Sequence, residues 1–213
     1  MEFEELVKTV GEEPVFETGL LLAGVVNPAD VRRQLSRWVT TGKAWQLRRG
    51  LYTLAPPFQK VKPHPFVVAN HLVRCSYVSM QSALAYYGLI PEYVPLVTSV
   101  TAGRPGHWDT MLGSYDFHHI KAGMFLGYKL TLLTAGQEAF VATREKALLD
   151  LVYLQVGRDS DGYLTELRLE RLDSLNLTEL NRLAVLSESL KLKRAAKIIS
   201  DLAASDKKDY ERL

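Results

Sequence analysis

Arginine and lysine residues that could bind a polyanion are concentrated in one segment of this 213-residue chain. Between Asp30 and Glu92 there are 61 residues without a single Asp or Glu. This segment contains nine basic residues: Arg32, Arg33, Arg37, Lys43, Arg48, Arg49, Lys60, Lys62 and Arg74. The formal net charge of the chain is +2, so the remaining 17 basic and 24 acidic residues give the rest a net charge of −7. A basic segment in an otherwise acidic chain predicts a polyanionic partner; a basic face that only aids solubility is the alternative.

Other reactive side chains form no recognisable catalytic or metal-binding pattern. Neighbouring strand residues point to opposite faces, so His118 and His119 cannot chelate one ion, and no Cys or carboxylate stands at metal-ligand spacing around His107. The single cysteine, Cys75, excludes a disulfide framework and is expected to be a small buried apolar residue. The chain has no phosphate-binding glycine loop, no Gly-x-Ser-x-Gly and no Cys–His signature. We therefore expect no cofactor, no metal and no catalytic residue.

A metal-dependent nuclease is the enzymatic alternative. Such a site needs two or three carboxylates and a lysine around a divalent cation. The residues that could be assembled into one are Asp109, Asp116, Glu145 and Lys146. Glu145 and Lys146 are adjacent in a predicted helix and point about 100° apart, which disfavours this interpretation.

Three helices and a hairpin are predicted to position the N-terminal arginines. Apolar residues recur at helical spacing over Phe3–Val10, and a short helix is expected over about 17–23, ending at Gly24. A third helix begins after the cap Asn27 and stops at Gly42. The core-facing side chains of the third helix are Val31, Leu35, Trp38 and Val39.

The polar face of this third helix carries side chains that can bind DNA, and it includes no acidic residue. Candidates for contacts in the groove are Arg33, Ser36, Arg37 and Thr40. Candidates for phosphate or minor-groove contacts are Arg32, Lys43, Arg48 and Arg49.

The segment from Lys43 to Leu54 has the pattern of a two-stranded ribbon that turns at Arg49-Gly50. Three helices followed by a basic hairpin are the order of a winged helix-turn-helix, whose third helix enters the major groove. Winged helices also bind other macromolecules, so an interaction module for protein or RNA is the non-enzymatic alternative.

The rest of the chain predicts a mixed α+β domain with a helical C-terminal part. Helices are expected after the caps Ser79 and Thr143, and three helical segments are expected after about residue 164. Strands are expected over 97–101, 114–120 and 126–134. The fold class is therefore α+β, with a winged helix-turn-helix in residues 1–60 and the second domain in residues 64–213. The linker is the proline-rich segment Lys60–Pro65, and the chain end Lys207–Arg212 is expected to be frayed.

Segments in both halves resemble AbiEi-family antitoxins, over about residues 15–200. The N-terminal match is the arginine helix that runs into Leu47-Arg48-Arg49-Gly50-Leu51-Tyr52. Ser79–Glu92 is similar to the family segment S-x-x-SAL-x-x-x-GL-x-P, and Val97–Thr101 with Arg104 is similar to its next strand. Val141–Leu151 is similar to the helix start A-T-x-E-K-A-L-L-D-L, with Arg144 where proline is common.

The resemblance implies a transcriptional autorepressor that binds double-stranded DNA at inverted repeats in its own promoter. It also implies that residues 64–213 form the antitoxin domain of a type IV toxin–antitoxin (abortive infection) system. That domain would counteract a nucleotidyltransferase-type toxin without forming a stable complex with it.

The composition is that of an ordinary globular protein. Hydrophobic residues make up 47% and charged residues 23% of the chain, which excludes disordered and collagen-like classes. Met1–Glu5 is acidic where a signal peptide would be basic, and the longest apolar run, Gly19–Val26, is too short to span a bilayer. We expect a cytoplasmic protein with no membrane partner.

Overall fold

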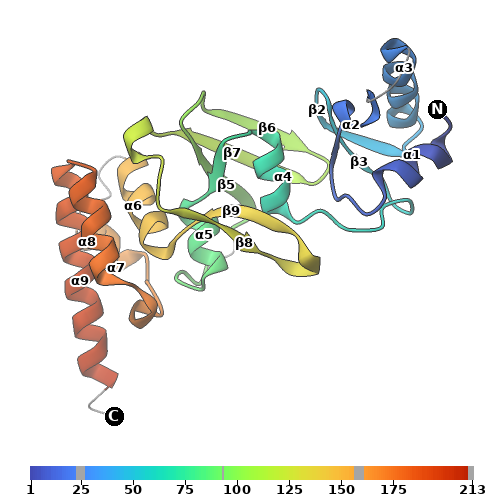
Figure 1. Ribbon diagram of the computed structural model, residues 1–213. Helices are drawn as coiled ribbons and strands as arrows, with labels where there is room; N and C mark the ends of the chain where they lie inside the picture. Colours follow the sequence, from blue (N-terminus) through green and yellow to red (C-terminus); the bar gives the residue numbers. More distant parts are fainter. Residues whose placement is uncertain (23–26, 93, 156–160, 211–213) are drawn as a thin grey trace.

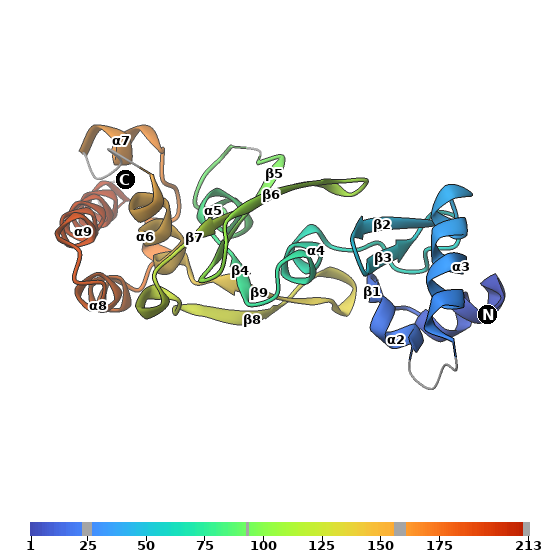
Figure 2. The same cartoon turned by 90° about the horizontal axis from the view of Figure 1, so that it is seen from above.

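The computed structural model describes residues 1–22, 27–92, 94–155 and 161–210 and has a mixed α+β architecture. N-terminal helices with a small sheet lie at one end, C-terminal helices lie at the other, and a six-stranded sheet lies between them (Figures 1 and 2). Within the described ranges, no helix is both long and apolar enough to cross a membrane.

The N-terminal unit combines helices with an antiparallel sheet of order β1-β3-β2. Its elements are α1 (Phe3–Val10), β1 (Phe16–Glu17), α2 (Thr18–Leu22), α3 (Pro28–Thr40), β2 (Ala44–Arg48) and β3 (Leu51–Leu54). The expected helices and the hairpin are confirmed as elements, whereas β1 has no local sequence signal because it pairs with the distant β3. The expected helix end at Gly24 lies outside the described residues.

Helix α3 forms where its capping residues predict it. The Oδ1 atom of Asn27 accepts a hydrogen bond from the backbone N–H of Ala29 at 3.1 Å, and Pro28 occupies the first turn. The helix ends at Thr40, just before Gly42, whose φ of +69° favours glycine. Of the side chains assigned to the core by helical spacing, Val31, Leu35 and Trp38 are buried and Val39 is partly buried against the same core.

The six-stranded sheet has the order β6-β7-β5-β4-β9-β8. Its strands are β4 (Ser76–Val78), β5 (Leu96–Thr101), β6 (Gly106–Thr110), β7 (Gly113–His119), β8 (Tyr128–Leu132) and β9 (Glu138–Ala142). The pairs β5–β7 and β4–β9 are parallel, and the other pairs are antiparallel. The strands expected over 97–101, 114–120 and 126–134 correspond to β5, β7 and β8.

Three helices pack beside this sheet and complete what we call the central domain. They are α4 (Pro65–Leu72), α5 (Met80–Tyr86) and α6 (Arg144–Leu154). The expected linker therefore ends inside a helix, because His64 caps α4 and Pro65 is its first residue. The run Phe66–Ala69 is entirely buried, so α4 lacks the amphipathic pattern that identifies a surface helix.

The C-terminal part is helical, as predicted. It contains α7 (Asp161–Glu166), α8 (Leu177–Leu186) and α9 (Leu190–Tyr210). Short 3₁₀ turns occur at Ala122–Met124, Thr134–Gly136 and Leu172–Ser174. Helix α9 continues to Tyr210, so most of the chain end that was expected to be frayed is helical.

Two residues of the central domain differ from the sequence-based expectation. Cys75 is exposed rather than buried, because it occupies the turn between α4 and β4 with a φ of +55°. Ser79 precedes α5 but makes no capping bond with its side chain. Its hydroxyl instead donates to the Oδ2 atom of Asp150, at 2.7 Å.

A β-bulge connects the N-terminal unit to the central domain. The register of β2 against β3 shifts between Gln46 and Arg48, which makes Leu47 the extra residue of β2. Ala44 is buried in the core of the N-terminal unit, whereas Leu47 packs into the core of the central domain. The N-terminal unit is therefore packed against the central domain through its hairpin.

Candidate nucleic-acid interface

The outward face of α3 brings together the residues predicted to enter the DNA groove. The exposed side chains of this face are Arg32, Arg33, Ser36, Arg37 and Thr40. Figure 2 shows α3 on the side of the N-terminal unit that points away from the six-stranded sheet. The face is therefore open to a large partner.

The arginines of α3 are available for an external anion. Arg33 pairs with Asp30 one turn earlier, but the two side chains are 74% and 57% exposed. An ion pair with both side chains this exposed contributes only about 0–1 kcal/mol to stability, so a DNA phosphate can replace Asp30 as the partner of Arg33. Among the described residues, Arg32 and Arg37 have no acidic partner.

Hydroxyl groups at the end of α3 bond to the helix itself. The Oγ1 atom of Thr40 donates to the carbonyl of Ser36 at 3.0 Å, and that of Thr41 donates to the carbonyl of Arg37 at 2.9 Å. With its proton used in this way, Thr40 can only accept a hydrogen bond from a base edge.

Lys43 lies at the end of α3 and is half-buried. Its Nζ atom lies 4.7 Å from the ring centroid of Phe3, and its backbone N–H donates to the carbonyl of Trp38 at 2.8 Å. The Phe3 ring in turn packs edge-on against Trp38. These contacts fix the position of the Lys43 side chain next to the end of α3.

The two arginines of the hairpin have different environments. Arg48 donates to the backbone carbonyl of His71 from Nε at 3.4 Å and from Nη2 at 3.1 Å, and its side chain is 30% exposed. Arg49 is exposed. No local pattern distinguishes these two arginines, because the difference depends on the packing of the hairpin turn against α4.

The hairpin turn lies at the junction of the N-terminal unit and the central domain. The carbonyl of Gly50 accepts a hydrogen bond from the N–H of Thr18 at 2.9 Å, and Arg74 pairs with Glu17 at 2.5 Å. In Figure 2 this turn is on the side facing α4, and α3 is on the far side. The structure thus brings the α3 residues together and separates them from Arg48 and Arg49.

No protein-family model and no curated protein matches this chain. The assignment of a function therefore depends on the residues of the chain and on their geometry.

The four residues of the nuclease alternative lie in two different environments. Asp109 and Asp116 are on the β6–β7 hairpin, where Nε2 of His107 lies 3.0 Å from the Oδ2 atom of Asp109 and Nδ1 lies 2.5 Å from the Oδ1 atom of Asp116. Glu145 is buried and accepts a hydrogen bond from the N–H of Asn176 at 2.8 Å. In the part of the chain that the structure describes, no group of three or more His, Cys, Asp or Glu residues is placed to hold a metal ion.

Two carboxylates, of Asp109 and Asp116, contact His107, although no metal-ligand spacing around it was expected from the sequence. Asp109 lies two residues along the same strand, and Asp116 is its direct partner on β7, so the alternation of the hairpin places all three on one face. Hydrogen bonds that His107 donates to the carboxylates of Asp116 and Asp109 raise its pKa above the ordinary value. All three residues can be read from the sequence, but placing them on one face requires the register of the β6–β7 hairpin, which was not predicted.

A buried polar cluster connects two of the segments that resemble the antitoxin family. Asp150 is fully buried and pairs with Lys146 one turn earlier in α6. It also accepts hydrogen bonds from the hydroxyls of Ser79 at 2.7 Å and Tyr77 at 3.0 Å. Burial raises the pKa of Asp150, and Lys146 opposes that shift. Because both carboxylate oxygens of Asp150 are engaged by these side chains, the cluster ties α6 to β4 and to the start of α5.

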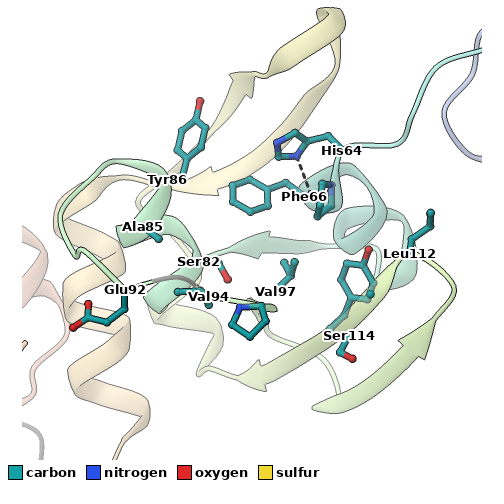
Figure 3. A pocket seen from close by; sticks show the side chains of 14 residues that line it. His64, Phe66, Ser82, Ala85, Tyr86, Glu92, Val94, Val97, Leu112 and Ser114 are labelled. Carbon is teal, nitrogen blue, oxygen red and sulfur yellow. Dashed lines mark hydrogen bonds between the residues drawn. The ribbon is translucent and has the colours of Figure 1, made fainter.

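A groove of about 540 Å³ lies between α4, α5 and β7 (Figure 3). His64 and Phe66 lie on its α4 side, Tyr86 on its α5 side, and Glu92 is the charged residue of its lining. Such a groove suits an apolar group and disfavours an anion, so it does not extend the basic surface of α3.

Proposed function

We propose that the N-terminal unit is a winged helix-turn-helix that binds double-stranded DNA through α3. The observation that carries this proposal is the outward face of α3, which presents three exposed arginines with Asp30 as its nearest acid. Arginine binds guanine edges and phosphates in bidentate geometry, and Ser and Thr add neutral contacts.

The positions of the eight candidate residues suggest different roles. Arg33, Ser36, Arg37 and Thr40 share the face that would enter the major groove, and Arg32 and Lys43 flank it and would bind phosphates. Arg49 is exposed at the hairpin turn, away from α3, so it would reach only DNA that extends past the α3 site, whereas Arg48 is engaged with His71 and positions the hairpin.

On this basis the protein is a transcriptional autorepressor and antitoxin of a type IV toxin–antitoxin system. The resemblance of the α3–hairpin segment and of the Ser79, Val97 and Val141 segments to the AbiEi family supports this assignment. The central domain and C-terminal helices would counteract a nucleotidyltransferase-type toxin, and the N-terminal unit would bind inverted repeats in the promoter of the operon.

A binding experiment with defined nucleic acids tests the proposal. Fluorescence anisotropy should show tight binding to the chain's own promoter duplex and weaker binding to duplex RNA and to single strands. Arg33→Ala or Arg37→Ala should reduce discrimination between promoter and unrelated duplex by 10- to 100-fold, about 1–3 kcal/mol for a lost bidentate contact.

The matched control is Arg182→Ala, which removes an exposed arginine that pairs with Glu179 on α8. This variant should bind the promoter as the unmodified chain does. Preference for duplex RNA, or equal promoter discrimination by both α3 variants, would contradict the proposal.

A further inference from the structure

The two border strands of the six-stranded sheet differ in their protection. Strand β6 carries the exposed His107 and Asp109, and charged side chains on an edge strand discourage pairing with another chain. Strand β8, the border on the other side (Figure 2), exposes Leu130 and Leu132, at 52% and 67%. Phe140, the partner of Leu130 on β9, is 44% exposed. The edge at β8 is thus more apolar than that of β6, with Lys129 as the exposed charged residue of the strand.

The hydrogen bonds around β8 show which of its backbone groups face outward. The N–H of Thr143 donates to the carbonyl of Gly127, and the N–H of Leu133 donates to the carbonyl of Gln137. In an antiparallel pair, hydrogen-bonded and non-hydrogen-bonded positions alternate. The odd-numbered residues from 127 to 133 therefore bond toward β9, and the even-numbered residues Tyr128, Leu130 and Leu132 direct their N–H and C=O groups to the free edge.

The backbone of β9 agrees with this assignment. The N–H of Phe140, which lies opposite Leu130, donates to the Oδ1 atom of Asn70 at 2.6 Å rather than to β8. The free edge of β8 therefore presents three N–H groups and three carbonyls. Two of these residues, Leu130 and Leu132, also expose apolar side chains, whereas Tyr128 packs partly against the core.

We propose that β8 pairs antiparallel with β8 of a second copy of this chain, across a two-fold axis at Leu130. This register sets Leu130 opposite Leu130 of the second copy and Tyr128 opposite Leu132. Each outward N–H then meets an outward carbonyl, because all paired positions are even-numbered. The sheets of the two copies become continuous, and the apolar side chains of β8 meet across the axis.

The charges on β8 are compatible with this register. Lys129 lies on the opposite face of the strand from Leu130 and would stand opposite Thr131 of the second copy, so the two lysines do not face each other. The same edge is therefore complementary to itself in backbone hydrogen bonds and apolar side chains, and this register sets no like charges directly opposite each other.

A two-fold dimer also fits the proposed DNA site. Two copies of α3 related by a two-fold axis match the symmetry of an inverted repeat. This link rests on the proposed function, but the pairing of β8 does not, so it is tested without DNA.

Sedimentation velocity measures the pairing directly. The mass should rise from 24.0 kDa toward twice that value as the concentration is increased through the micromolar range. Leu130→Lys sets two like charges opposite each other, and Leu130→Pro removes an outward N–H without breaking the β8–β9 ladder. Both variants should remain at the mass of one chain. Met111→Lys, which changes an apolar residue 69% exposed at the β6–β7 turn, should dimerise normally.

Site-directed crosslinking tests the register in a fully folded chain. In a Cys75→Ser background, Leu130→Cys places two thiols at directly opposed positions, whose Cα atoms are about 5.5 Å apart in a hydrogen-bonded pair. A short bismaleimide should crosslink this variant into dimers, and Met111→Cys should give background levels only. A single-chain mass at every concentration, or equal crosslinking of both cysteine variants, would overturn the proposal.

Discussion

At the scale of single residues, His107 tests the hairpin geometry through its titration. Since Asp116 and Asp109 raise its pKa, the histidine stays protonated at pH values where a free imidazole is neutral. Its contribution to stability is fully present below the ordinary histidine value and is lost as the pH rises through the folded-state pKa. An NMR titration should show a pKa above 6.5 for His107. Asp116→Asn should bring it back toward the ordinary value, and an unchanged pKa in that variant would contradict the contact.

Lys146 and Asp150 should behave as one unit. Lys146→Met leaves a carboxylate buried without its cation, which costs about 3–5 kcal/mol of unfolding free energy. The double variant Lys146→Met with Asp150→Asn should be more stable than Lys146→Met alone, since no charge remains buried. Urea denaturation of the three proteins checks this coupling; equal stability of the single and double variants would refute it.

The pH dependence of Lys146→Met follows from the same pair. Burial raises the folded-state pKa of Asp150 above 3.8, so the unfolded chain releases this proton first and stability falls as the pH rises toward the folded-state value. Lys146 opposes the rise in the pKa of Asp150, so without Lys146 the folded-state pKa rises further and the pH range over which stability falls becomes wider. The stability deficit of the variant relative to the unmodified chain should therefore shrink as the pH is lowered toward 4, and a constant deficit would be inconsistent with a charged Asp150.

At the scale of elements, the N-terminus of α3 depends on its cap. Asn27→Ala removes the acceptor for the N–H of Ala29 and should cost about 1 kcal/mol of unfolding free energy. Asn27→Ser, which keeps an acceptor, should restore most of that loss. Chemical denaturation measures both, and equal stability of the two variants would show that the cap bond contributes nothing.

Arg48 should matter more for the hairpin position than for DNA. Its two hydrogen bonds to the carbonyl of His71 are charge-assisted, so Arg48→Ala should cost about 1–2 kcal/mol. Arg49→Ala, the exposed neighbour, should leave stability unchanged but reduce the salt dependence of DNA binding. The opposite pattern would assign the DNA contact to Arg48.

The elements that the sequence predicted are those whose signals are local. The cap Asn27, the stop at Gly42 and the apolar spacing of α3 all lie within one segment, and the turn at Arg49-Gly50 marks the hairpin. The run Phe66–Ala69 of α4 and the whole of strand β4 are buried and therefore lack the alternation that distinguishes helix from strand. The packing of Arg48 on α4 depends on contacts between segments far apart in the chain, so no local pattern could predict it.

The functional residues likewise fall into those that local spacing predicts and those that depend on contacts between distant segments. The exposure of the α3 arginines follows from helical spacing, and the structure places them as that spacing predicts. The cluster around His107 and the outward groups of β8 both depend on strand register, which fixes which residues share a face. Once the register is known, both can be derived by counting residues along the strands.

At the scale of the whole molecule, the basic surface and the rest of the chain occupy different regions. Helix α3 lies at one end and α7–α9 lie at the other, with the central domain between them (Figure 1). This arrangement leaves both α3 and the β8 edge open to partners, as the two proposals require. The small net charge of +2 therefore hides a local charge that is strongly positive.

The salt dependence of promoter binding tests the central claim most directly. Each phosphate contact contributes a slope of about −0.9 in a plot of log K against log salt concentration. Replacing Arg32, Arg33 and Arg37 together by alanine should weaken binding and reduce the magnitude of that slope by between about 2 and 3. Arg182→Ala should leave both unchanged. A triple variant whose affinity and slope equal those of the unmodified chain would show that α3 does not bind DNA.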